Sequence, residues 1–187
     1  MYDELLSSLS GRLDRVEAAV RGEFGSLTPA QLNWRPAEGA WGVGHCLEHL
    51  MKSNAPYFPI FSRATSGTWC HTFAERLPWL PRLWGRIVYN AVKPATKRKT
   101  PAPKMSRPTT DAIPGDIVDR FCMQQRELIV AMQGLKDLDL YKFIITSPLF
   151  WLVTYNLRDA VEIIVAHEER HLLQAQRALA NMIRTED

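Results

Sequence analysis

Four segments of this chain repeat apolar residues at intervals of three and four positions, and this periodicity constrains the fold more than any other feature. Such spacing gathers apolar side chains on one face of an α-helix and polar side chains on the other. The predicted helices span residues 3–23, about 42–56, 116–133 and 156–183. Pro56 or Pro59 disturbs the end of the second helix, and Gly134 stops the third. Four amphipathic helices predict an all-α fold, a four-helix bundle.

Residues 66–113 form a different kind of segment, rich in proline and in positive charge. The stretch 76–107 has nine basic residues and no acidic one, whereas the rest of the chain has 14 basic and 20 acidic residues. A short amphipathic helix is predicted within 77–92, and 93–115 is predicted to be a connection without a fixed helix. We therefore expect a single domain, 1–187, with a basic insertion at about 66–113. Its length permits the second and third helices to run parallel, as a long crossover.

The cysteines, the N-terminal residues and the most apolar segment indicate a cellular compartment. The three cysteines, Cys46, Cys70 and Cys122, form no C-x-x-C pair, which suits a reducing environment. The first residues, MYDELLSSL, lack the basic and apolar regions of a secretory signal. The most apolar run, Phe143–Leu157, contains Pro148 and is shorter than the ~20 residues that a membrane-spanning helix needs. These features predict a cytoplasmic protein.

The last predicted helix carries two histidines on its apolar side. At about 100° per residue, His171 lies about 40° from His167, within the arc that also holds Ile164 and Ala178. Glu168 falls in the same arc, at about 100° from His167, where an unpaired carboxylate is costly to bury. Both imidazoles are therefore expected to point into the bundle. Glu168 is expected either to be paired or to lie exposed near the end of the bundle.

The second predicted helix carries another pair at the same spacing, His45 and His49. His49 borders the apolar arc, whereas His45 lies about 40° further toward the polar side. His45 is expected to be a residue of the rim or one that supports a metal ligand. The stretch 167–171, HEERH, matches the H-E-x-x-H signature of zinc proteases, but such enzymes need a third ligand, commonly further along the chain. Sixteen residues follow His171, and Glu186 among them is a poor candidate. His49 is therefore the expected third ligand, and a protease is the weaker interpretation.

The stretches WRPAEGAWGVGHCLEHL (34–50) and HEERHLLQ (167–174) resemble the DinB-like family of bacterial metalloenzymes. The family's pattern is Trp-x-Pro, a second Trp, an inward His followed by Leu, and a C-terminal H-x-x-x-H with a Gln shortly after. The matching residues are Trp34, Pro36, Trp41, His49, Leu50, His167, His171 and Gln174. The resemblance implies a four-helix bundle with a long crossover and a divalent metal, often zinc or nickel. It implies that His49, His167 and His171 hold this metal.

The resemblance covers residues 1–60 and about 113–183 and says nothing specific about the basic insertion. The chain departs from the family's pattern at Gly42, where Ser or Thr is common after the second Trp. It departs again at His45, where Glu or Gln is common. The insertion is a third departure.

A site with three imidazole ligands leaves positions open for water or substrate, as catalytic metal sites do. Related subfamilies are similar to thiol-dependent S-transferases, so the first hypothesis is a transferase in which the metal activates a low-molecular-weight thiol against a small electrophile. The second is a metal-dependent hydrolase that uses activated water, with Glu168 as the base. Glu168 and His45 are the candidate proton carriers. Both hypotheses require a small-molecule substrate.

A third hypothesis is non-enzymatic and concerns partners. The basic stretch 76–107 would dock on an anionic membrane or on nucleic acid, with Trp79, Trp84 and Tyr89 at the interface. In the favoured interpretation, these aromatics pack on the bundle and the lysines form a solvated loop. A bundle of this kind is also compatible with a homodimer.

The other tryptophans and the first cysteine are expected to be structural. Trp34 and Trp41 are predicted to wedge the loop between the first two helices against the end of the bundle, and Trp151 to anchor the entry to the last helix. Cys46 is predicted to be a small buried residue rather than a reactive thiol.

Overall fold

Four long helical elements make up the body of the molecule, close to where the periodicity places them. The computed structural model describes residues 2–72, 74–76, 80–96, 101–109 and 112–186. The four elements are α1 (Asp3–Phe24), α3 (Val43–Asn54) continued by α4 (Tyr57–Thr65), α6 (Ile117–Gln133) and α7 (Leu157–Glu186). The prediction of an all-α four-helix bundle is confirmed. No helix in the described part of the chain combines the length and the apolar character needed to cross a membrane.

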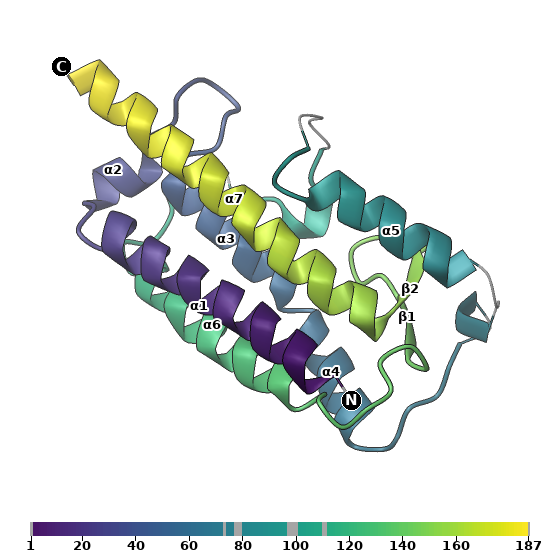
Figure 1. Ribbon diagram of the computed structural model, residues 1–187. Coiled ribbons are helices and arrows are strands. Elements are labelled where there is room, and N and C mark those ends of the chain that lie inside the picture. Colours follow the sequence, from purple (N-terminus) through teal and green to yellow (C-terminus); the bar gives the residue numbers. More distant parts are fainter. Residues whose placement is uncertain (1, 73, 77–79, 97–100, 110–111, 187) are drawn as a thin grey trace.

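The direction of the helices follows from the long connection in the middle of the chain. α1 packs against α6 and α7, and α3 packs against the same two helices. Figure 1 shows α3 and α6 running in the same direction, with α1 and α7 running the opposite way. Two neighbouring helices can run parallel because the chain between them is long enough to return along the bundle.

The core consists of two apolar clusters with buried polar residues between them. Fully buried members of the first cluster are Leu6, Leu13, Phe61, Leu128 and Met132. Fully buried members of the second are Phe24, Leu47, Leu50, Phe121 and Cys122. Along their helices, Asn54, Gln125 and Glu168 fall between the residues of the two clusters, and all three are buried. Because buried polar groups need hydrogen-bond partners, this polar layer sets how the helices fit together.

Short elements join the long helices. α2 (Pro29–Asn33) forms a short helix in the first interhelical loop, and a capping box between Thr28 and Gln31 starts it. Before α7, β1 (Ile144–Thr146) and β2 (Thr154–Asn156) form an antiparallel hairpin that the sequence did not predict. Strands of three residues are too short to show an alternating pattern. Trp151 lies at the hairpin tip with 79% of its surface exposed, so the prediction that it anchors α7 is wrong.

The described part of the basic insertion packs against the bundle. It contains η1 (Ala74–Arg76), α5 (Leu80–Val92) and η2 (Lys104–Ser106). α5 packs on α7 and on β2, and a Cβ at Gly85 would lie 2.1 Å from the Oδ2 atom of Asp159, so the two helices approach closely there. Tyr89 packs against the first apolar cluster, as the favoured interpretation of the aromatics predicted.

The prediction for 93–115 needs a correction. This stretch contains the short helix η2, whose Ser106 is completely buried, so it is not a plain solvated connection. Trp79, one of the predicted interface aromatics, lies outside the described residues. So do Lys97, Arg98 and Lys99 of the basic run.

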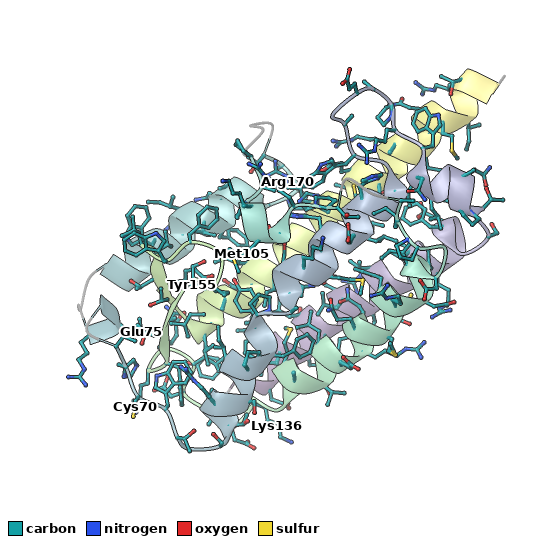
Figure 2. The ribbon with its side chains drawn as sticks, turned by 180° about the vertical axis from the view of Figure 1, so that it is seen from behind. Cys70, Glu75, Met105, Lys136, Tyr155 and Arg170 are labelled. Carbon is teal, nitrogen blue, oxygen red and sulfur yellow. The ribbon has the colours of Figure 1, made fainter. Side chains whose placement is uncertain are left out.

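Glu75 attaches the start of the insertion to the hairpin. Its carboxylate accepts hydrogen bonds from the backbone N–H of Thr72 (2.8 Å) and from the backbone N–H and hydroxyl of Thr146 (2.7 and 2.9 Å). Figure 2 shows Glu75 at the same end of the molecule as Tyr155 of the hairpin. Burial alone raises the pKa of Glu75, but these hydrogen bonds to the charged form outweigh burial and hold the pKa below its ordinary value.

This attachment is expected to weaken in acid. Because the folded pKa of Glu75 lies below its ordinary value of 4.5, its contribution to the unfolding free energy is present above about pH 4.5. It is lost as the pH falls through the folded pKa. Chemical denaturation of the wild type and of Glu75→Gln should give a stability difference that shrinks between pH 6 and pH 3. A difference that stays constant over this range would contradict the account.

Candidate metal centre

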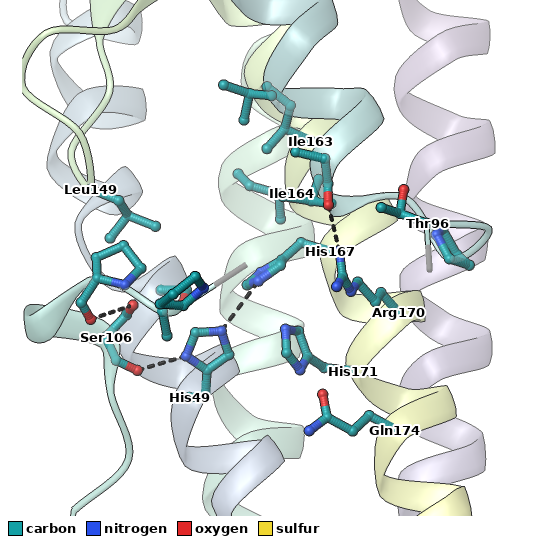
Figure 3. A pocket seen from close by; sticks show the side chains of 18 of the residues that line it. His49, Thr96, Ser106, Leu149, Ile163, Ile164, His167, Arg170, His171 and Gln174 are labelled. Carbon is teal, nitrogen blue, oxygen red and sulfur yellow. Dashed lines mark hydrogen bonds between the residues drawn. The ribbon is translucent and has the colours of Figure 1, made fainter. Parts of the chain in front are cut away.

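Three histidine side chains from two helices meet in the wall of one cavity. His49 comes from α3, and His167 and His171 come from α7. One ring nitrogen of each lies within 4.8 Å of those of the other two, and the Nε2 atoms of His49 and His167 are 3.2 Å apart. Figure 3 shows the three rings facing one another. The structure therefore brings together the three side chains that the resemblance implies as metal ligands.

Local structure explains why the rings converge. A spacing of four residues puts His167 and His171 on one face of α7, and α3 packs against this helix with His49 on the facing side. The Trp41 ring lies beside two of them, 4.7 Å from the His49 ring and 5.7 Å from the His171 ring between centroids. Trp41 packs against the second apolar cluster, as predicted for a loop residue wedged against the bundle. Its position beside two of the histidine rings was not predicted.

Gly42, a departure from the family's pattern, is explained by a close backbone approach. It stands immediately before α3, and a Cβ at this position would lie 1.8 Å from the backbone oxygen of Trp34. A side chain such as Ser or Thr would push the loop that carries Trp41 away from the helix. The glycine thus helps to keep Trp41 beside the histidine rings.

The three imidazoles are held in the uncharged form. Burial lowers the pKa of all three, and for His171 the value falls to about 3. In His167 the neighbouring rings of His171 and His49 lower the pKa further. Neutral imidazole is the form that binds a metal ion.

Hydrogen bonding fixes the tautomer of His49. Its Nδ1 lies 2.6 Å from the backbone oxygen of Ser106, and a carbonyl can only accept, so Nδ1 carries the proton and donates it. The Nε2 atom then offers its lone pair toward the other two rings. A backbone carbonyl that orients a metal-binding imidazole in this way is a common feature of metal sites.

The donor set fits a divalent metal ion. The Nδ1 atom of His171 is buried and makes no hydrogen bond with any described residue. Two nitrogens that are each about 2.0–2.1 Å from a tetrahedral zinc ion lie about 3.3 Å from each other. The His49–His167 separation of 3.2 Å is close to this value. Together with three neutral rings, these observations show that the residues can hold a metal.

The cavity in front of the histidines has a volume of about 960 Å³. α5, α7, the hairpin and the segment around η2 form its walls. The apolar residues that line it include Val88, Val92, Phe150, Ile163 and Ile164. Among the described lining residues, the charged side chains are Arg170 and Arg177, and none is Asp or Glu. The cavity therefore suits an organic molecule that is not positively charged.

Glu168, a candidate proton carrier, does not line this cavity. Its carboxylate accepts a hydrogen bond from the Asn54 side-chain amide at 2.6 Å and another from the Gln125 side-chain amide. Burial raises the pKa of Glu168 to about 7, and the two amide donors oppose this rise. Glu168 is thus paired, one of its two expected placements, and it ties α7 to α3 and α6. Its placement does not favour the role of a base facing the cavity.

His45, the other candidate proton carrier, also lies elsewhere. It is 1% exposed, so the alternative that places it at a polar rim is wrong. Its Nε2 atom is 2.6 Å from the guanidinium of Arg35, and both residues line a second, smaller pocket. Burial, and next the charge of Arg35, lower the pKa of His45. Cys46 beside it is fully buried, which raises the pKa of its thiol to about 12, as expected for a structural residue.

Some residues of the site escaped the sequence analysis. Ser106 acts through its backbone oxygen, and a carbonyl leaves no signature in a sequence. Arg170, three residues after His167, lines the cavity and donates a hydrogen bond to the backbone oxygen of Ala91 in α5. Helical spacing from the histidines would have found it. Tyr57 and Tyr155 line the cavity as a pair, with their hydroxyls 2.6 Å apart.

Comparison with known proteins bears on the family and the fold. A family model for the DinB superfamily matches residues 12–175. No curated protein matches the chain. Among solved structures, the chain is similar to YfiT from Bacillus subtilis, which is described as a probable metal-dependent hydrolase with an unusual four-helix bundle topology. The two are 16% identical with a TM-score of 0.59, over 97% of this chain and 90% of that one. At this identity the likeness shows the fold.

Removing two of the three rings should remove the metal. We expect the purified wild type to contain about one equivalent of a divalent metal, and His167→Ala/His171→Ala to contain less than a tenth of that, since one imidazole cannot hold the ion. Elemental analysis of both proteins measures this, with His71→Ala as the control for loss of a histidine elsewhere. Undiminished metal in the double variant would exclude these ligands.

The structural role of Glu168 predicts a stability difference. Glu168→Ala leaves two buried amide groups without an acceptor and should lower the unfolding free energy by about 2–5 kcal/mol. Glu169→Ala, which removes a partly exposed ion pair with Arg12, should cost about 0–1 kcal/mol. Urea denaturation distinguishes the two. Equal, small losses would show that Glu168 does not hold the polar layer together.

Proposed function

The chain belongs to the DinB superfamily, and on this premise we propose that it is a metal-dependent enzyme that transfers a low-molecular-weight thiol to a small electrophilic molecule. The observation that supports this most is the set of three neutral imidazoles in the wall of a large cavity without a described carboxylate. Zinc and nickel are the proposed metals, since imidazole nitrogen suits both.

The choice of nucleophile rests on which groups line the cavity. When bound, a divalent metal supplies positive charge that lowers the pKa of a coordinated water or deprotonates a coordinated thiol outright. A thiol has an ordinary pKa of about 8.5, so it can be deprotonated without help from a protein carboxylate. In the proposed reaction the thiol gives its proton to solvent and its sulfur bonds to an electrophilic carbon. The bond from that carbon to the leaving group breaks, and the leaving group departs with the bonding electron pair.

The chain's own residues would bind and orient the reactants. Ser106 keeps the His49 ring in one tautomer and one orientation. Trp41 lies beside two of the rings and limits the access of water from one side. The paired hydroxyls of Tyr57 and Tyr155 provide polar groups in an otherwise apolar wall. Arg170 places a cationic side chain three residues from His167 on α7 and lines the same cavity.

Hydrolysis by metal-activated water is the second candidate. The description of YfiT as a probable metal-dependent hydrolase favours it, because the fold is shared. The placement of Glu168 is an argument against the version in which this carboxylate is the base, since it accepts hydrogen bonds from Asn54 and Gln125 instead of facing the cavity. The non-enzymatic hypothesis, in which the basic insertion docks on an anionic surface, stays a prediction.

Dependence on added thiol separates the two reactions. With the metal-loaded enzyme, turnover of a chromogenic aryl halide should require glutathione, bacillithiol or mycothiol and should fall at least 100-fold in His49→Ala. Glu168→Gln should retain most of the activity. The matched assay follows hydrolysis of a p-nitrophenyl ester without thiol. Ester turnover that needs no thiol, together with an inert aryl halide, would favour the hydrolase over the transferase.

A further inference from the structure

A second, smaller pocket adjoins the large cavity beside Trp41. Its volume is about 270 Å³, enough for a compact ion or an acidic end group. It shares four wall residues with the large cavity, namely Gly39, Trp41, Pro101 and Ala102. Trp41 also stacks near His49 at 4.7 Å between ring centroids. The two spaces are therefore neighbours with a shared wall.

Arg35 and His45 form one side of this pocket. The Arg35 guanidinium donates a hydrogen bond to Nε2 of His45 at 2.6 Å, and His45 is almost completely buried. With Nε2 accepting, the proton of the imidazole sits on Nδ1, which makes no hydrogen bond with any described residue. A buried imidazole thus fixes one edge of the guanidinium. The other N–H groups of Arg35 have no partner among the described residues.

Arg107, the last residue of the basic stretch, also lines this pocket. Its Nε–H donates to the backbone oxygen of Ala102 at 2.9 Å, which holds the head group at the wall of the pocket. Its terminal nitrogens form no hydrogen bond or ion pair with described residues. Each of the two guanidinium groups therefore makes one hydrogen bond within the protein and keeps its other N–H donors for a ligand. Guanidinium donors in this arrangement match the oxygens of a carboxylate, sulfate or phosphate.

The charged residues among the described lining of the pocket are both positive. None of the described lining residues is acidic. Glu48, on the same helix as His45, has both carboxylate oxygens engaged, one by Lys52 at 2.9 Å and the other by the backbone N–H of Thr109 at 2.7 Å. The charge of Glu48 is thus compensated by Lys52, and the charges of Arg35 and Arg107 remain.

We infer that the pocket formed by Arg35, His45 and Arg107 is an anion subsite that binds the acidic end group of the small molecule processed at the histidine centre. The anion binding follows from the pocket alone, whereas the link to substrate rests on the proposed function. His45 acts here as a positioning residue for Arg35. The insertion contributes Arg107 and the wall that carries it.

Calorimetric titration of the protein with sodium sulfate, at constant ionic strength set with sodium chloride, tests the anion subsite. We expect one saturable site per chain. Arg35→Gln and Arg107→Gln should each weaken sulfate binding about tenfold or more, because each removes charge-assisted hydrogen bonds. Arg120→Gln, which changes an exposed arginine on α6, should bind as the wild type does. Equal affinity in all three variants, or no saturable binding, would overturn the inference.

Two variants of His45 test whether it positions Arg35, and the double histidine variant tests whether sulfate binding depends on the metal. His45→Leu removes the acceptor for Arg35 and should weaken sulfate binding several-fold, whereas His45→Gln keeps an acceptor and should largely restore it; thermal melts check that each variant is folded. Sulfate binding should persist in His167→Ala/His171→Ala. Loss of sulfate binding with the metal would place the ion at the histidines and overturn the subsite. Persistent binding in a wild type that holds no metal would leave the subsite intact and remove its link to a metal-dependent reaction.

Discussion

Three imidazole rings packed together inside a protein cannot all carry a proton, and the rest of this structure is consistent with that constraint. Burial and mutual repulsion lower the pKa of His167, and burial lowers those of His49 and His171. Each neutral ring can offer one nitrogen lone pair to the space between the rings, and burying these lone pairs without a partner costs free energy. A divalent cation satisfies them together, which is why the same arrangement that is costly in an empty core is useful in a catalytic one.

The helices that carry these rings, α3 and α7, are held in their relative positions by another buried side chain, that of Glu168. Glu168 follows His167 directly and accepts hydrogen bonds from α3 and α6, so a rotation of α7 that displaced the histidines would also break this polar layer. The basic insertion also contributes to the site. It supplies the carbonyl of Ser106 to His49 and closes the cavity with α5. Two departures from the family's pattern, His45 and the insertion, both contribute residues to the wall of the small pocket beside Trp41.

Periodicity was sufficient to predict the bundle, because each long helix buries one face and the apolar spacing records it. It also placed His167, His171 and His49 inward, and the resemblance supplied their grouping. What it could not predict depends on contacts between distant segments. The hairpin has strands of three residues, Ser106 acts through its backbone, and the burial of His45 depends on the loop that carries Arg35. Glu168 was correctly placed in the apolar arc, yet its partners Asn54 and Gln125 come from two other helices.

The central claim is that the rings of His49, His167 and His171 bind one cation. A crystal structure of the purified protein with anomalous diffraction, measured on both sides of the absorption edges of zinc and nickel, tests it most directly. The account predicts one strong anomalous peak about 2.0–2.3 Å from a nitrogen of each of the three rings, with further coordination sites facing the cavity. Ordered rings with no peak between them, or a peak held by other residues, would contradict it.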